Sequence, residues 1–123
     1  ASRGIGKAIA IKLAICGANI TLVARNQNDL DTVYETINNS GGKVQTIIGD
    51  VSNLDSFSGV VTQTLEKWKQ VDILINNAGI TRDNLIMRMK ENEWDNVIDI
   101  NLNSNYYLIK EILIFCLMRS VKK

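Results

Sequence analysis

Apolar and polar residues follow two kinds of pattern along the chain. Four stretches place apolar residues at helical spacing, and three short stretches between them are mostly apolar and rich in β-branched residues. The first pattern predicts helices and the second predicts buried strands. The predicted helices span 5–15, 28–40, 53–68 and most of 94–118, and the predicted strands span 19–24, 44–48 and 71–75. Residues 77–88 have the pattern of a loop, and Asn28 or Asp29 is expected to cap the second helix.

Helices and strands alternate, which is typical of an α/β domain with a parallel sheet covered on both faces. We therefore expect a Rossmann-like, doubly wound parallel sheet in one domain over 1–123. The strand order of such sheets places a further strand between 19–24 and 71–75, and this sequence offers no candidate for it. Because the chain begins in a glycine-containing turn and ends just after an apolar helix, the fold is expected to be incomplete. A gap or a direct pairing between those two strands is the expected result.

Composition narrows the possible functions. Of the 123 residues, 46% are hydrophobic and 22% are charged, which fits a globular domain and not a disordered tail. The net charge is +1, so charge gives no reason to expect nucleic acid or a membrane surface as a partner. The apolar runs are too short to span a bilayer. The sequence has no His and two widely separated cysteines, so we expect no metal site and an intracellular setting.

The first candidate site is the turn that opens the first helix. Backbone N–H groups at a helix N-terminus bind phosphate, and glycine lets the backbone approach a pyrophosphate closely. Arg25 follows the first predicted strand, where arginine suits the 2′-phosphate of a dinucleotide, and Arg3 could converge on the same phosphate. Taken alone, the turn could also be an ordinary glycine turn, and Arg25 a solvated side chain. The residues of the turn are Ser2, Arg3, Gly4, Ile5 and Gly6.

Two further candidates follow the next two strands. Asp50 and Val51 come after the second predicted strand, where a carboxylate and a backbone N–H can bind an adenine. Asp50 or Ser52 could instead cap the next helix. Residues 76–79, Asn-Asn-Ala-Gly, end the third predicted strand, and small residues at that edge leave room for a flat cofactor. A plain strand-to-loop turn is the alternative there.

Two polar features lie in the last predicted helix. Asn101 carries an amide near the buried face that needs hydrogen-bond partners. It either holds a water or an active-site side chain, or it lies on the helix surface. Tyr106 and Lys110 share one face at i, i+4 spacing, an arrangement that can lower the pKa of a tyrosine. A packed tyrosine beside a lysine that reaches solvent is the more common outcome of this spacing.

Taken in order, these motifs resemble those of the short-chain dehydrogenase/reductase family. Residues 1–6 match the end of that family's Thr-Gly-x-x-x-Gly-x-Gly turn, residues 76–79 match its Asn-Asn-Ala-Gly motif, and Asn101 falls at its catalytic Asn. The longer stretch 76–90 is similar to members that reduce 3-oxoacyl groups on acyl carrier protein in fatty-acid biosynthesis. Acetoacetyl-CoA reductases are the nearest alternative, followed by other short-chain dehydrogenases and by a nucleotide-binding domain without redox chemistry.

The resemblance implies an NADPH-dependent oxidoreductase in which this chain forms part of the cofactor-binding domain. It implies that Arg3 and Arg25 meet the 2′-phosphate, that Asp50 and Val51 meet the adenine, and that Asn101 holds a water on the proton path. The other cofactor-binding residues that it implies are Ser2, Gly4, Ile5 and Gly6 at the pyrophosphate, and Asn77, Ala78, Gly79 and Ile80 beside the ribose and nicotinamide.

The resemblance also sets expectations beyond the cofactor. The family's catalytic Ser and Tyr-x-x-x-Lys would follow Lys123, so Tyr106 and Lys110 are not taken as the catalytic pair. Members usually form homotetramers through helices that include the equivalent of 94–118, in a bacterial cytoplasm or an organelle such as the plastid. The expected partner is an acidic acyl carrier protein, which the basic residues among 119–123 would help to dock. Alone, these 123 residues are expected to be neither active nor a stable domain.

Overall fold

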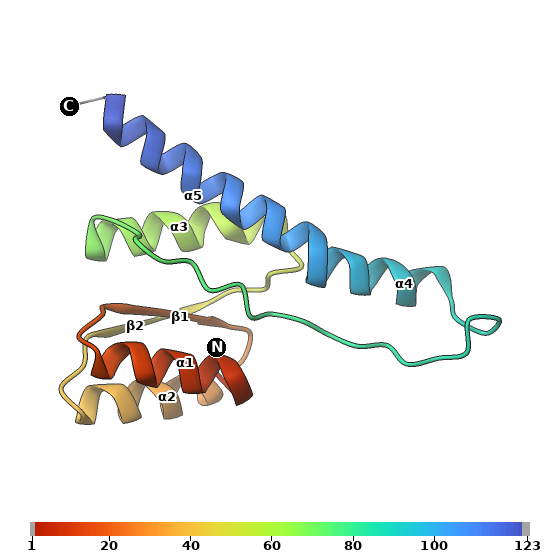
Figure 1. The fold of residues 1–123 in the computed structure, drawn as a ribbon, viewed down its shortest axis with the longest axis horizontal. Coiled ribbons are helices and arrows are strands. Elements are labelled where there is room, and N and C mark those ends of the chain that lie inside the picture. Colours follow the sequence, from red (N-terminus) through yellow and green to blue (C-terminus); the bar gives the residue numbers. More distant parts are fainter. Residues whose placement is uncertain (1, 122–123) are drawn as a thin grey trace.

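The computed structural model describes residues 2–121, in which helices and strands alternate before a long helical segment (Figure 1). The elements are α1 (Gly4–Ile15), β1 (Ile20–Ala24), α2 (Gln27–Asn39), β2 (Val44–Ile48), α3 (Leu54–Trp68), α4 (Glu91–Ile98), the π-helical turn η1 (Asp99–Asn103) and α5 (Ser104–Val121). The sequence therefore predicts the order of the first five elements correctly, and most of their bounds to within about two residues.

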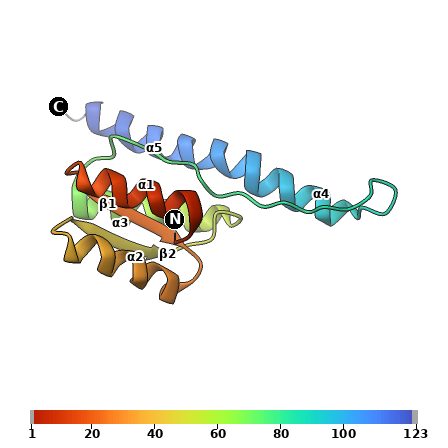
Figure 2. The ribbon, with the colours of Figure 1, turned by 60° about the horizontal axis from the view of Figure 1, so that its bottom comes forward.

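The sheet has two parallel strands. β1 pairs with β2 from Ile20 opposite Val44 to Ala24 opposite Ile48. α1 and α2 pack side by side on one face, while α3 lies on the other face and packs against α5 (Figures 1 and 2). This arrangement confirms the α/β, Rossmann-like class, since the sheet is parallel and carries helices on both faces.

The core of the molecule lies between the sheet and the α1–α2 pair. Leu22 on β1 is fully buried against Leu30, Val33 and Ile37, which recur at helical spacing along α2. Burying side chains of this size contributes about 1.5–3 kcal/mol each, so this apolar stripe fixes α2 on the sheet. The opposite face is covered by three buried side chains of α3, namely Phe57, Val60 and Val61.

The cap of α2 differs from the expected one. We expected Asn28 or Asp29, but the cap is Asn26, whose side chain accepts a hydrogen bond from the Asp29 N–H at 3.3 Å. The helix begins almost directly after β1, so the first residue that can cap it comes earlier than the apolar spacing suggests. For α3, the expected start at residue 53 is correct to within one residue: the helix begins at Leu54, and Asn53 caps it by accepting a hydrogen bond from the Asp55 N–H at 3.0 Å.

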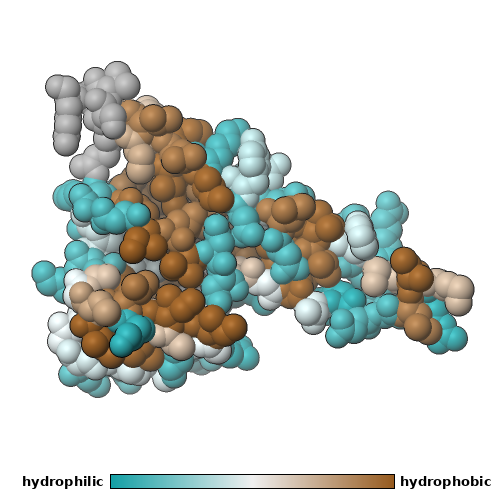
Figure 3. All heavy atoms as spheres, in the orientation of Figure 1, coloured by the Kyte–Doolittle hydropathy of each residue, from teal (hydrophilic) through white to brown (hydrophobic). Residues whose placement is uncertain are grey.

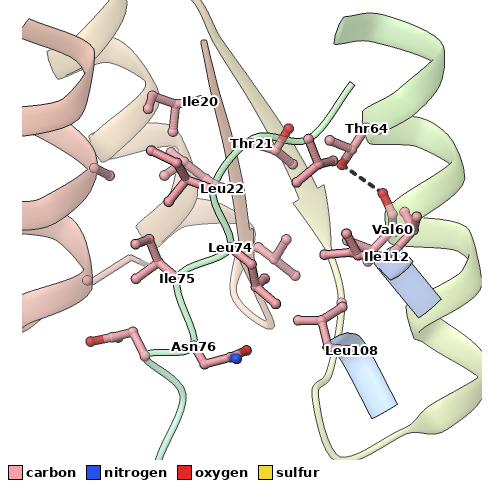
Figure 4. Close-up of a pocket in the computed structure, with 18 of the residues that line it drawn as sticks. Ile20, Thr21, Leu22, Val60, Thr64, Leu74, Ile75, Asn76, Leu108 and Ile112 are labelled. Atoms are coloured by element: carbon pink, nitrogen blue, oxygen red, sulfur yellow. Dashed lines mark hydrogen bonds between the residues drawn. The ribbon is translucent and has the colours of Figure 1, made fainter. Parts of the chain in front are cut away.

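The predicted strand 71–75 is not a strand in this structure. Residues 70–80 run irregularly past β1, and a cavity of ≈ 480 Å³ separates the two segments (Figure 4). A strand is defined by the ladder that it forms with a neighbour, and residues 71–75 lie across a gap from the nearest strand. Ile73 and Ile75 are accordingly 63% and 47% exposed. Of the two expected results for this region, a gap and a direct pairing, the structure has the gap.

The segment after residue 90 forms one long helical rod (Figure 2), in which the π-helical turn η1 joins α4 to α5. The predicted apolar face of its first part is not buried, since Trp94 and Leu102 are 58% and 62% exposed. Apolar side chains also gather on the surface of α5 (Figure 3). Over the part of the chain that the structure describes, no helix is long and apolar enough to cross a membrane, and no cluster of His, Cys, Asp and Glu could hold a metal ion.

Candidate functional site

The turn before α1 is built for close approach to its backbone. Arg3 is the N-cap, and Gly4 follows with a φ of +52°, a conformation that side-chain-bearing residues rarely adopt. Within the described residues, no side chain caps α1 and its first turn holds no acidic residue, whereas α2 and α3 each have an Asn cap and an Asp. The first N–H groups of α1 are therefore available to an anionic ligand, as a phosphate-binding turn requires.

Of the two arginines that were expected to share one phosphate, Arg3 is paired with a carboxylate and Arg25 acts on one through its charge. Arg3 forms an ion pair with Asp29 in the first turn of α2, with 2.8 Å between Arg3 Nη2 and Asp29 Oδ2. Arg25, exposed at the end of β1, lies close enough to Asp50 for its positive charge to act on that carboxylate. Both cations thus lie at the carboxyl end of the sheet, beside α2 and the loop after β2.

Asp50 is held in a tight local turn after β2. Its Oδ1 accepts hydrogen bonds from the Ser52 N–H at 2.9 Å and the Ser52 hydroxyl at 2.7 Å. The bond from the Ser52 backbone lowers the pKa of Asp50 most; partial burial opposes that effect, and the Ser52 hydroxyl and Arg25 add to it. Neither Asp50 nor Ser52 caps α3, so the capping alternative for these residues is wrong. The carboxylate stays charged and in a fixed position.

Asn101 joins the last helical segment to the loop that follows residue 76. Its amide nitrogen donates to the Ile80 carbonyl at 2.8 Å, and its amide oxygen accepts the Ile80 N–H at 3.0 Å. A Cβ added at Gly79 would lie 2.7 Å from that same oxygen, so the loop fits against Asn101 because residue 79 is glycine. Asn101 is therefore neither a free surface amide nor open to a water on both of its polar atoms.

The cavity beside β1 collects part of the predicted site. Its wall includes Gly6, Asp50, Val51, Asn77 and Ala78, which come from three separate segments of the chain. The close-up in Figure 4 shows Leu22, Ile75 and Asn76 along the wall of this cavity, with Asn76 at one end. Outside the wall lie the remaining predicted residues, namely Ser2, Arg3, Gly4, Ile5, Arg25, Gly79, Ile80 and Asn101.

Two other expectations concern residues near the end of the chain. Tyr106 is 60% exposed and packs edge-to-face on Tyr107, with 5.2 Å between ring centroids. The basic residues that were expected to dock the carrier protein lie outside the described part of the structure. Lys122 and Lys123 are not described at all, and the side chain of Arg119 is not described.

Sequence reasoning missed two features of the site. The sequence suggests Asp29 only as a helix cap, because its ion-pair partner Arg3 lies 26 residues away and no local pattern connects the two. Gly49 was not predicted to be a packing residue, yet a Cβ there would lie 3.1 Å from Val23 Cγ1 and 3.2 Å from Val60 Cγ2. A glycine directly after a strand is the signal that could have suggested such a close approach.

Comparison with known proteins places the chain in a family. The model of the family described as short chain dehydrogenase matches residues 1–121. A 3-oxoacyl-[acyl-carrier-protein] reductase of Synechocystis sp. is 40% identical over 113 residues, which cover 91% of this chain and 46% of that protein. The FabG reductase of the same name from Staphylococcus epidermidis is 41% identical with the same coverage. The chain thus spans less than half the length of these relatives.

Solved structures agree with that placement. A metagenomic short-chain oxidoreductase in complex with NADP superposes with a TM-score of 0.87 at 36% identity, covering 91% of this chain and 51% of that one. An actinorhodin polyketide ketoreductase with NADPH superposes with a TM-score of 0.88 at 26% identity, covering 91% of this chain and 43% of that one. With its parallel sheet, its glycine turn and its Asn-Asn-Ala-Gly run, the chain belongs to the short-chain dehydrogenase family.

Proposed function

We propose that the protein carrying this chain reduces 3-oxoacyl groups on acyl carrier protein to 3-hydroxyacyl groups with NADPH. The observation that carries the proposal is one cavity whose wall includes Gly6 of the glycine turn, Asp50 and Val51 after β2, and Asn77 and Ala78 of the loop that Asn101 anchors. The substrate follows from relatives at 40–41% identity that are named for this reaction. In this proposal, residues 1–123 form part of the NADP-binding Rossmann domain.

The residues present fit NADPH. Gly4 at φ +52° and the buried Gly6 leave the start of α1 without side chains that would block a pyrophosphate. Arg3 and Arg25 supply two positive charges for a 2′-phosphate, and an acidic residue that would favour a free 2′-hydroxyl is absent from the end of β1. Asp50 with the Val51 backbone is assigned to the adenine.

The nicotinamide end is assigned to the loop that Asn101 holds. Asn77 and Ala78 line the cavity there, Gly79 and Ile80 continue the loop, and Asn101 fixes this loop through the Ile80 backbone. The bound cofactor supplies the hydride, while the work of this chain is to bind, to orient and to exclude water. Asn101 acts as a positioning residue in this scheme, and its role in holding a water on the proton path remains a proposal.

The test uses the whole protein with matched thioester substrates. NADPH consumption is measured with the same 3-oxoacyl group on acyl carrier protein and on coenzyme A, and a higher kcat/KM is expected with the carrier protein. Turnover of the coenzyme A ester alone would favour an acetoacetyl-CoA reductase, and no turnover of either would contradict the proposal. Asn101→Ala is expected to lower the rate with both substrates, whereas Asn96→Ala, an exposed amide in α4, leaves both unchanged.

A further inference from the structure

We propose that Asp29 is a positioning residue for the choice of NADPH over NADH, and that it acts through Arg3. The proposal rests on the proposed function, because it concerns the 2′-phosphate of the same cofactor. It adds a residue that makes no contact with the cofactor but sets the direction of a group that does.

The geometry of the ion pair leaves one edge of the guanidinium open. Arg3 Nε donates to Asp29 Oδ2 at 2.9 Å, and Arg3 Nη2 lies 2.8 Å from the same oxygen, so the carboxylate occupies the side edge of the guanidinium. The end edge, formed by Nη1 and the second N–H of Nη2, keeps a pair of parallel donors. Such a pair matches two oxygens of a phosphate. Arg3 is 78% exposed, which leaves that edge accessible.

Asp29 is itself held in place by the fold. Its side chain is only 29% exposed, and its N–H donates to the capping Asn26 side chain at 3.3 Å. The next residue, Leu30, is completely buried in the core. The carboxylate therefore stands at a fixed point between α1 and α2, and a long arginine that binds to it loses much of its rotamer freedom before any ligand arrives.

Asp29 orients Arg3 toward the phosphate, but its negative charge also repels that phosphate. The larger of these two effects decides whether Asp29 strengthens or weakens NADPH binding. A phosphate on the end edge occupies the edge next to the one that Asp29 takes, in an exposed and salt-screened position where charge effects are weak. A bidentate contact depends strongly on orientation. Orientation is therefore the larger effect, and Asp29 favours NADPH.

The experiment measures cofactor binding to the whole protein by nicotinamide fluorescence. Asp29→Ala is expected to weaken NADPH binding roughly three-fold, the scale of an exposed ion pair, and to leave NADH binding unchanged. Asp29→Asn keeps a hydrogen-bond acceptor and is expected to recover most of the loss. Asp31→Ala is the matched control, because Asp31 is an exposed acid of the same helix that bonds to Gln27 and not to Arg3.

A second variant shows whether the effect passes through Arg3. Arg3→Ala is expected to weaken NADPH binding, and Asp29→Ala added to it is expected to change nothing further. An unchanged or tighter NADPH complex in Asp29→Ala alone, an equal loss for NADH, or a full loss in the Arg3→Ala background would each overturn the inference. A protein that binds neither nucleotide would overturn the proposed function along with it, so the two failures are distinguishable.

Discussion

Replacing Gly79 with alanine tests whether Asn101 holds the cofactor-side loop in place. A Cβ at residue 79 would lie 2.7 Å from Asn101 Oδ1, closer than real Cβ atoms approach an oxygen. That oxygen accepts the Ile80 N–H at 3.0 Å, so it cannot retreat and keep this bond. The bond from the Asn101 amide nitrogen to the Ile80 carbonyl, at 2.8 Å, is disturbed with it.

The expected cost follows from the two hydrogen bonds. Each contributes about 0.5–1.5 kcal/mol, so Gly79→Ala should cost about 1–3 kcal/mol in the free energy that holds the loop. Asn101→Ala removes the same two bonds and should cost a similar amount. In that background no oxygen remains for the new Cβ to meet, so adding Gly79→Ala should cost almost nothing more.

The assay compares kcat/KM for NADPH with the midpoint of thermal unfolding for the single and double variants of the whole protein. Because the loop is exposed and irregular, activity should fall more than the unfolding midpoint does. Gly59→Ala is the control, since a Cβ there meets no atom within 4 Å and lies inside α3, where alanine should stabilise by about 0.5–1 kcal/mol. Additive losses in the double variant, or an unaffected Gly79→Ala enzyme, would refute the reasoning.

Three further predictions concern the adenosine side. Arg25→Asp should lower kcat/KM for NADPH by roughly 10- to 100-fold through the lost charge-assisted contact, and equal use of NADPH and NADH by the unmutated protein would contradict this. Gly4→Ala should cost about 1–2 kcal/mol in thermal unfolding, because its φ of +52° is strained for alanine although no atom blocks the Cβ. The lowered pKa of Asp50 should contribute stability above about pH 4 that is lost as pH falls through the folded-state pKa. Acid unfolding followed by circular dichroism checks this, and Asp50→Asn should flatten the pH dependence in that window.

The parts of the fold that the sequence predicts are those decided by nearby residues. The stripe of Leu30, Val33 and Ile37 identifies α2 and its buried face, and all three are at most 1% exposed. The apolar spacing likewise predicts the helix over 53–68 that becomes α3, whereas the cap is Asn53 and not the expected Asp50 or Ser52. The strand at 71–75 fails because its formation depends on a neighbour that local pattern does not supply.

In the candidate site, too, local motifs are predictable from the sequence, whereas contacts between distant residues are not. Glycines and arginines at element ends are visible as motifs, so the sequence suggests where phosphate and adenine could bind. The partners of these groups are set by tertiary distance: Arg3 meets Asp29 across 26 residues, and Asn101 meets Ile80 across 21. The sequence indicates that Asn101 needs hydrogen-bond partners. Only the structure shows that its amide oxygen and its amide nitrogen both bond to the backbone of Ile80.

Side-chain contacts, more than strand pairing, set the spacing between the two ends of the site. In the proposed site, the adenosine side is assigned to α1, β1 and β2, whereas the loop at 77–80 is tied by Asn101 to the helical segment that continues into α5. A cavity of ≈ 480 Å³ separates the two sides (Figure 4). α5 packs on α3, and α3 is joined to the sheet by its buried face and by the hydrogen bond from Trp68 Nε1 to Thr21 Oγ1 at 2.9 Å. Under the proposed function, the distance that a dinucleotide would span is therefore set through α3 and α5.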